Sequence, residues 1–349
     1  MVLPGQRQDS VTAYHATVQV LVLGATGFIG GHVARAALAR GWHVRALRRR
    51  PNAVGAIGDV ADRIEWIQGE LPFVASPGGG SERGADVRDA MRGCDVVFHA
   101  AAAYPRAERD IAGWVRGSVM QMRAVLQAAR DANVGRLVYT SSLTTVGLPG
   151  QPGRLADERD FYVPGSVRSA YYEAKYAMEM EAFRAAAEGL PIVILNPTTV
   201  LGPGDIKPTT SELLLYVARR QIPFYFQTRI NIVDGRDVAA AHVSAAEHAS
   251  CGQRYILGGH NLALKDGLTI AAHAAGVTPP RWEIPFHTVE ALVGLGDWLR
   301  LPLPDLARTL RFLQPLNSDK AHRELGMHPR PVEETARDTI EWFRKNRYL

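Results

Sequence analysis

A tyrosine and a lysine lie four residues apart in the run Tyr171-Tyr172-Glu173-Ala174-Lys175. On a helix this spacing places both side chains on one face. An ammonium group beside a phenol stabilises the phenolate and lowers the pKa of the tyrosine. Tyr171 could then exchange a proton with a carbonyl or alcohol oxygen. Tyr172 is the competing tyrosine, but its three-residue spacing to Lys175 fits less well.

A serine pair precedes this motif, at the end of the run Val138-Tyr139-Thr140-Ser141-Ser142. The run reads as the end of a buried strand, and catalytic groups gather at the carboxyl edge of a parallel sheet. A serine hydroxyl there can bond a substrate oxygen and orient it. We favour Ser142 for this role and expect Ser141 to bond locally to the backbone. The predicted catalytic residues are therefore Ser142, Tyr171 and Lys175.

Three glycines stand at the exit of an apolar N-terminal run, Val18-Gln19-Val20-Leu21-Val22-Leu23-Gly24-Ala25-Thr26-Gly27-Phe28-Ile29-Gly30. Glycines in such a turn let backbone N–H groups approach a pyrophosphate, and the following helix adds partial positive charge at its N-terminus. Gly24 would make the turn, Gly27 the close approach and Gly30 the tight contact of helix with strand. The spacing G-x-x-G-x-x-G between a strand and a helix predicts dinucleotide binding. Combined with Tyr171, it makes hydride transfer the leading hypothesis.

The end of the second expected strand indicates which dinucleotide is bound. NAD binders place an acid there for the ribose hydroxyls, whereas an arginine suits the 2′-phosphate of NADP. The chain reads Leu47-Arg48-Arg49-Arg50, and no acid follows until Asp59. Arg48 and Arg49 could fork onto a phosphate. The pattern favours NADP. Two alternatives stay open: that the cofactor is NAD, and that the arginines only form an exposed turn.

The first half of the chain alternates short β-type runs with longer helical patterns, which is typical of parallel βαβ units. The expected strands are Val18–Leu23, His43–Leu47, Ile64–Gln68, Val96–His99, Leu137–Thr140 and Ile192–Leu195. The expected helices are Phe28–Arg40, Asp86–Met91, Ile111–Asn133 and Ala170–Glu188. Right-handed crossovers then give an α/β fold, a Rossmann-type doubly wound parallel sheet with a smaller C-terminal substrate-binding lobe.

This pattern divides the chain into three parts. Residues 1–17 form an N-terminal extension, residues 18–196 an NAD(P)-binding Rossmann domain, and residues 197–349 mainly the lobe, with some return to the sheet. Only two weak strand signals lie in the third part, Ile230–Val233 and Arg254–Leu257, and two amphipathic helices are expected within Asp319–Asn346. Pro72–Gly84 reads as a surface loop. The apolar stretch Trp282–Leu306 is either ordinary lobe core or an apolar mouth for the substrate.

Composition excludes several other classes of protein. The 349 residues carry 40 basic and 35 acidic side chains, a mild excess that a solvated surface explains. No basic-aromatic interleaving or zinc-finger spacing supports nucleic-acid binding. The two cysteines, Cys94 and Cys251, show no metal-ligand spacing, so neither a metal site nor a disulfide is expected. No signal-type segment and no apolar run of about 18 residues is visible, so we expect a cytoplasmic protein without a membrane span.

Together these motifs resemble the extended short-chain dehydrogenases/reductases, also described as the NAD-dependent epimerase/dehydratase family. The resemblance rests on Gly24–Gly30, Phe98-His99-Ala100-Ala101, Tyr139–Ser142 and Tyr171-x-x-x-Lys175. The runs Asn196–Thr209 and Arg254–Leu262 narrow the resemblance to one subgroup, which contains the hopanoid-associated sugar epimerases and the dihydroflavonol-4-reductase-like members. Members of the family often dimerise through a helix bundle that includes the Tyr/Lys helix, so the resemblance allows a homodimer.

The resemblance also implies roles for individual residues. Ser142, Tyr171 and Lys175 would form a triad, with Lys175 also holding the nicotinamide ribose. Glu70 and Leu71 would lie near the adenine, Ala100 and its neighbours would line the adenine ribose, and Pro197–Val200 would pack beside the nicotinamide. The implied cofactor-binding residues are Gly24, Thr26, Gly27, Phe28, Ile29, Gly30, Arg48, Arg49, Glu70, Leu71, Ala100, Ala101, Ala102, Thr140, Tyr171, Lys175, Pro197, Thr198, Thr199 and Val200.

Three functions fit these residues: a carbonyl reductase, an epimerase or dehydratase of a nucleotide sugar, and a non-enzymatic NADP-sensing regulator. The regulator is disfavoured because it has no need of a Ser/Tyr/Lys set. A nucleotide-sugar enzyme needs cations for the substrate pyrophosphate, and Arg229 and Arg236 are candidates. Nucleotide-sugar epimerases typically have an Arg-Pro-Gly-Asp turn ahead of the C-terminal helices, and this chain has Arg311–Lys320 there instead. We therefore favour a reductase acting on the ketone of a small, aromatic or polyketide-like substrate.

Overall fold

The computed structural model describes residues 18–71, 87–102, 110–208, 210–288, 291, 295 and 313–349. The expected N-terminal extension, the Pro72–Gly84 loop and most of the apolar stretch after residue 288 lie outside the described residues.

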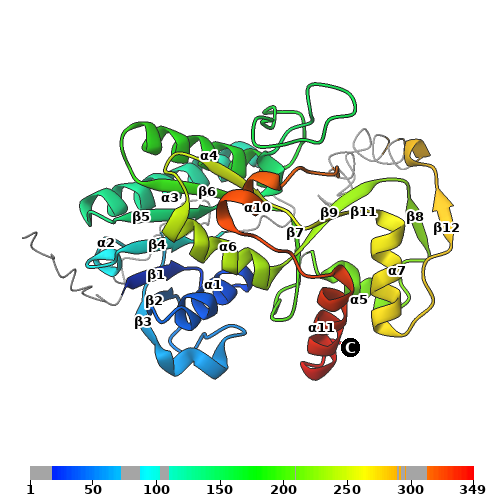
Figure 1. The fold of residues 1–349 in the computed structure, drawn as a ribbon, viewed down its shortest axis with the longest axis horizontal. Helices are drawn as coiled ribbons and strands as arrows, with labels where there is room; N and C mark the ends of the chain where they lie inside the picture. Colours follow the sequence, from blue (N-terminus) through cyan, green and yellow to red (C-terminus); the bar gives the residue numbers. More distant parts are fainter. Residues whose placement is uncertain are drawn as a thin grey trace, which may run out of the picture.

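A seven-stranded parallel sheet forms the centre of the molecule, with strand order β10-β6-β5-β4-β1-β2-β3 (Figure 1). Its strands are β1 (Gln19–Leu23), β2 (His43–Arg48), β3 (Ile64–Gln68), β4 (Val96–His99), β5 (Arg136–Thr140), β6 (Ile192–Pro197) and β10 (Arg254–Leu257). This order reverses between β1 and β4, as in a doubly wound Rossmann-type sheet. The predicted fold class is confirmed, and the six strands and four helices expected in the first half match within two residues at each end.

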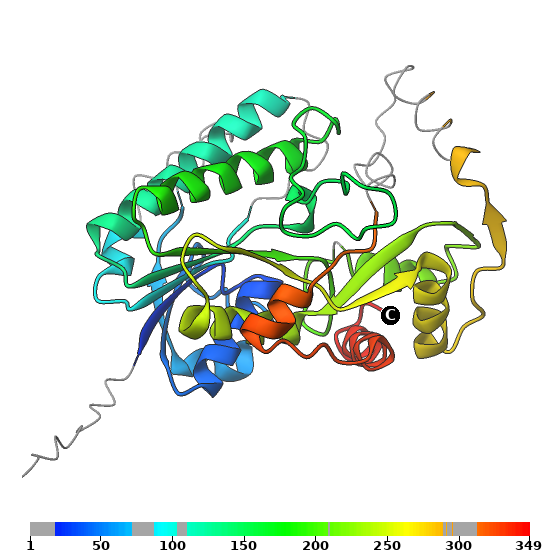
Figure 2. The same cartoon turned by 45° about the horizontal axis from the view of Figure 1, so that its top comes forward.

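Helices cover both faces of this sheet (Figures 1 and 2). One layer contains α1 (Phe28–Ala39), α6 (Gly235–His248) and α10 (Asp319–Leu325), and the other contains α2 (Val87–Met91), α3 (Ile111–Asp131) and α4 (Ala170–Ala187). The central strands are therefore apolar on both faces. In β1, Val20 and Val22 pack into the first layer while Leu21 and Leu23 pack into the second.

The smaller lobe lies beyond the carboxyl ends of the strands (Figure 2). It contains one sheet of β7 (Thr199–Leu201), β9 (Arg229–Asp234) and β11 (His260–Ala263), and another of β8 (Phe224–Phe226) and β12 (Trp282–Ile284). Helices α5 (Glu212–Ala218), α7 (Leu264–Ala275) and α11 (Val332–Lys345) pack around them. Four of these strands were not predicted, because segments of three or four residues show too little periodicity.

The second half of the chain also returns to the main sheet. Strand β10 pairs in parallel with β6, so a strand that follows the lobe's first elements completes the sheet edge. The two predicted tail helices are confirmed as α10 and α11, and Gly326 ends α10 in the left-handed conformation at φ 61°. Among the described helices, none is both long and apolar enough to span a bilayer.

Candidate active site

The turn from β1 into α1 brings backbone segments into unusually close contact. Gly24 has φ 95°, and a Cβ there would lie 2.7 Å from the backbone nitrogen of Ala101. A Cβ on Gly30 would lie 2.2 Å from the carbonyl oxygen of Gly24. Only glycine therefore lets the turn, the end of β4 and the first turn of α1 meet. Gly27 is exposed as the N-cap of α1 and supplies no side-chain cap, so the helix N-terminus is open to an anion.

A further glycine contributes to this turn and was missed in the sequence. Gly55 has φ 62°, and a Cβ there would lie 2.5 Å from the carbonyl oxygen of Thr26. The loop that follows β2 therefore packs directly on the glycine turn. The signal that could have revealed it in the sequence is a glycine that follows the arginine run Arg48–Arg50 by a few residues.

The predicted Arg48, Arg49 and Glu70 lie at the ends of β2 and β3, where Arg49 contacts Glu70. The Arg48 guanidinium lies over the ring of Trp66, 5.0 Å from its centroid. Arg49 forms a 3.4 Å ion pair with Glu70, and their side chains are 72% and 45% exposed. An ion pair this exposed is weak, so the Arg49 guanidinium can accept a stronger anionic partner. Leu71, the next residue, is half-buried.

Tyr171 and Lys175 lie one turn apart near the start of α4. The ammonium nitrogen of Lys175 donates to the carbonyl oxygen of Thr140, 3.1 Å away at the carboxyl end of β5. Both residues line a small cavity between α3 and α4 whose other lining residues are Ala102, Ser118, Gln121, Ala174 and Met178. Tyr171 also packs against an aromatic cluster, but Tyr172 is buried within that cluster, with its ring 5.6 Å from that of Tyr162, and does not line the cavity. The structure thus brings Tyr171, and not Tyr172, to one cavity with Lys175.

The charge of Lys175 is tuned by its surroundings. Burial lowers the pKa of Lys175 to about 8, and the nearby carboxylate of Glu179 acts in the opposite direction. Burial, together with a smaller effect of the Lys175 charge, lowers the pKa of His99 to about 3. At neutral pH the lysine is therefore mainly protonated and the histidine neutral. Neither ring nitrogen of His99 has a hydrogen-bond partner among the described residues.

The two serines at the end of β5 are held differently. Ser142 caps the 3₁₀ turn η2 (Leu143–Thr145), and its hydroxyl oxygen accepts from the Thr144 N–H at 3.2 Å. The hydroxyl of Ser141 instead donates to the carboxylate of Glu179. We expected Ser141 to bond to the backbone, and this was wrong because a buried carboxylate lies within its reach.

Other predicted cofactor residues occupy varied positions. The Thr140 hydroxyl hydrogen-bonds His242 Nε2 at 2.8 Å, so only its backbone carbonyl faces Lys175. Thr198 donates to the Asn231 side chain at 2.8 Å. Ala102 lies in the Tyr/Lys cavity, while Thr199 lines a different cavity in the lobe.

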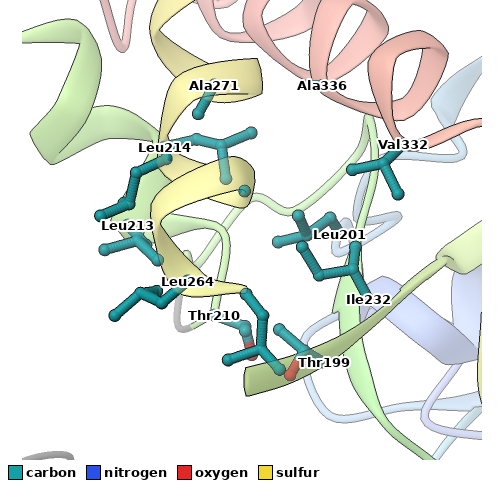
Figure 3. Close-up of a pocket in the computed structure, with 13 residues that line it drawn as sticks. Thr199, Leu201, Thr210, Leu213, Leu214, Ile232, Leu264, Ala271, Val332 and Ala336 are labelled. Atoms are coloured by element: carbon teal, nitrogen blue, oxygen red, sulfur yellow. The ribbon is translucent and has the colours of Figure 1, made fainter. Parts of the chain in front are cut away.

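That second cavity is a separate apolar space in the lobe (Figure 3). It lies among α5, α7, α11 and the strands β7 and β9, and its lining shares no residue with the Tyr/Lys cavity. The lining residues are Thr199, Leu201, Thr210, Leu213, Leu214, Ile230, Ile232, Leu264, Gly267, Leu268, Ala271, Val332 and Ala336. Nearly all of its apolar members belong to the lobe core, so we regard it as a packing space and not as the catalytic centre.

Arg236, a candidate pyrophosphate ligand, is already paired. Its guanidinium lies 2.8 Å from carboxylate oxygens of both Asp234 and Asp338. These bonds raise its pKa above the usual range for arginine, with the Asp234 hydrogen bond contributing most. Binding a nucleotide-sugar pyrophosphate would have to break this pairing, in which only the Asp234 carboxylate is fully buried. Arg229 is exposed at the start of β9.

A doubly wound parallel sheet with a glycine turn after its first strand defines a dinucleotide-binding α/β protein of Rossmann type. Residues 20–258 match the model of the NAD dependent epimerase/dehydratase family, and the chain belongs to that family. It is an NAD(P)-dependent enzyme of the oxidoreductase or epimerase kind.

Individual relatives carry both reductase and epimerase names. The chain is 34% identical to a putative dihydroflavonol 4-reductase of Synechocystis sp., over 94% of this chain and 95% of that protein. It is 28% identical to the 4-hydroxy-2-methyl-3-oxo-4-farnesyl-3,4-dihydroquinoline-1-oxide ketoreductase of Stigmatella aurantiaca, over 93% and 96%. Among solved structures, a nucleoside-diphosphate-sugar epimerase from Pseudomonas aeruginosa is similar with a TM-score of 0.78, at 29% identity over 96% and 100% of the two chains.

Proposed function

We propose that the chain is an NADPH-dependent carbonyl reductase that converts the ketone of a small, largely apolar substrate into an alcohol. The observation that carries this proposal is the placement of Tyr171 and Lys175 in one cavity, with the Lys175 ammonium tied to Thr140 at the carboxyl edge of the sheet. Ligands of doubly wound sheets bind at this edge.

The glycine turn fits a dinucleotide. Side chains are excluded at Gly24 and Gly30 by backbone contacts, and the exposed Gly27 leaves the N-terminus of α1 open to a pyrophosphate. Arg48 and Arg49 would hold the 2′-phosphate, which is why we propose NADPH over NADH. When bound, the reduced nicotinamide supplies the hydride.

The chain's own residues manage the proton and the orientation of the carbonyl. The hydroxyl oxygen of Ser142 accepts from Thr144, which leaves the Ser142 proton free to donate to the substrate oxygen. Tyr171 gives its proton to that same oxygen as charge develops there. The protonated Lys175 then stabilises the phenolate that remains on Tyr171.

An epimerase or dehydratase of a nucleotide sugar is the second candidate, favoured by the similarity to the Pseudomonas aeruginosa protein. The pairing of Arg236 with Asp234 and Asp338 weighs against it, because the site then lacks one expected cation for a pyrophosphate. The name of the Synechocystis relative favours the reductase.

An isotope experiment separates the two. The purified protein is incubated with NADPH or NADH deuterated at nicotinamide C4, together with aromatic and polyketide-like ketones or with nucleotide sugars. A reductase consumes the cofactor and leaves deuterium in an alcohol product. An isomerised sugar without net cofactor consumption would overturn our proposal in favour of the epimerase.

A further inference from the structure

Glu179 is a buried carboxylate that the proposed mechanism does not use. It lies on α4 one turn beyond Lys175 and two turns beyond Tyr171, and its side chain is 0% exposed. Its Oε2 accepts hydrogen bonds from the Ser141 hydroxyl, from Thr145 Oγ1 at 2.7 Å and from Asn196 Nδ2 at 2.7 Å. A carboxylate is costly to bury unless it is both hydrogen-bonded and paired with a cation, so this arrangement needs a reason.

The cation is Arg254, which begins β10 and has a side chain 3% exposed. Its Nε lies 3.3 Å from Glu179 Oε1, without the alignment of a hydrogen bond, so the attraction is mainly between charges. The guanidinium also lies over the Phe161 ring at 4.4 Å, and its Nη2 donates to the Thr145 carbonyl at 3.3 Å. Arg254 therefore reaches the same short turn that Glu179 holds.

That turn carries Ser142. Two donors to Glu179, Ser141 and Thr145, lie on either side of Ser142 in the chain. The carbonyl of Ser142 itself accepts from Asn196 Nδ2 at 3.1 Å. It also lies 3.0 Å from Thr145 Oγ1, whose one proton is shared between this carbonyl and the nearer Glu179 Oε2. Glu179 thus joins the turn that holds the serine to the helix that holds Tyr171 and Lys175.

We propose that Glu179 is a positioning residue for the reaction, which fixes the Ser142 hydroxyl relative to Tyr171 and Lys175, with Arg254 as its counterion. This inference rests on the proposed function, because that function gives Ser142, Tyr171 and Lys175 their roles. Displacement of reacting groups by about 1 Å can reduce turnover about 100-fold, so a small shift of this turn should be visible in kcat.

The test compares Glu179→Gln with Glu181→Gln on the same helix. Glu181 pairs with Arg123 near the surface, 15% exposed, and touches neither the turn nor the cavity. We expect Glu179→Gln to lower kcat by roughly 100-fold while the Kd for NADPH and the fraction of folded protein stay near those of the parent. Glu181→Gln should match the parent in all three.

Amide hydrogen exchange adds a measurement that does not depend on turnover. The amides of Ser141, Thr144, Thr145 and Val146 all have acceptors in or beside the turn. In Glu179→Gln the exchange of segment 141–146 should accelerate, while that of the glycine turn at 24–30 should not. If exchange changes but the parent reduces no ketone, Glu179 still anchors the turn, whereas the proposed function fails and the role of Glu179 in catalysis fails with it.

A folded Glu179→Gln protein with parental kcat and parental exchange would overturn the inference. A variant that loses NADPH binding and folded protein in proportion to kcat would also overturn it, because the role would then be only structural. If Glu179→Gln does not fold, Thr145→Val removes one donor and Thr145→Ser restores it. Loss of kcat in the valine variant without recovery in the serine variant would then count against the proposal.

Discussion

The ammonium nitrogen of Lys175 lies 3.1 Å from the carbonyl oxygen of Thr140, which fastens α4 to the end of β5 two residues before Ser142. An ammonium group has three N–H donors, and this bond uses one of them. In the mechanism that we propose, the remaining donors would serve the phenol oxygen of Tyr171 and a ribose hydroxyl. The backbone of β5 therefore fixes the position of the Lys175 ammonium group.

The choice between the two adjacent tyrosines is directly testable. Tyr171→Phe should lower kcat by about 10² to 10⁴-fold, the usual contribution of a positioned acid, with little change in NADPH affinity. Tyr172→Phe is the matched control, because Tyr172 lies in the cluster with Tyr162. Steady-state kinetics and fluorescence titration with NADPH measure both effects. Parental turnover in Tyr171→Phe would remove Tyr171 from the mechanism.

Lys175 should make stability depend on alkaline pH. Its pKa is about 8 in the folded protein and 10.5 ordinarily. Between these values the unfolded chain binds more protons than the folded one, so stability rises with pH across this window. Below pH 8, burial of the charged Lys175 lowers the free energy of unfolding by about 3 kcal/mol relative to a lysine whose pKa is not shifted.

Lys175→Met removes this titration and serves as the reference. The difference in unfolding free energy between Lys175→Met and the parent should be largest below pH 8 and should shrink by about 3 kcal/mol as pH approaches 10.5. Urea unfolding at several pH values measures it. A difference that stays constant with pH would contradict the lowered pKa of Lys175.

Cofactor preference should depend on the arginine run. Replacing Arg48 with Ser and Arg49 with Glu should raise the Kd for NADPH about tenfold or more, with a change for NADH below about threefold. Arg50→Ser, next in the run and exposed, is the control. Equal losses for the two cofactors would show that these arginines do not read the 2′-phosphate.

Substitutions at two glycines in the turn between β1 and α1 should affect protein stability and NADPH binding differently. Gly30→Ala places a methyl group against the Gly24 carbonyl and should cost about 1–3 kcal/mol, as overpacking does. Gly27→Ala meets that oxygen only at 3.2 Å, so it should cost less than about 1 kcal/mol while weakening NADPH binding. Denaturant unfolding and cofactor titration measure the pair. Gly58→Ala, with its nearest contact at 3.6 Å, should alter neither.

The parts of this protein that sequence could predict are those with local signals. The β1 run, the glycine turn and the four-residue spacing of Tyr171 and Lys175 each lie within one short segment. Strands buried on both faces give continuous apolar runs that are easy to recognise. The main sheet was therefore predicted with small errors at the strand ends.

The Glu179 network could not be predicted in the same way, because its members come from α4, β6, β10 and the turn after β5. A charged residue in an apolar strand, such as Arg254, is recognisably unusual in the sequence. The sequence does not show, however, which residue it pairs with. The same holds for the Thr140 bond to His242. Four of the five lobe strands were missed because each has only three or four residues, too few to show a period.

The pairing of Arg254 with Glu179 also bears on how the enzyme is made. During synthesis, Ser142, Tyr171 and Lys175 leave the ribosome well before the strand that carries Arg254. Until that strand docks beside β6, the Glu179 carboxylate lacks its buried counterion. If Ser142, Tyr171 and Lys175 act as we propose, the nascent chain would contain all three before the Glu179 network is complete, so catalytic competence should arrive late in translation.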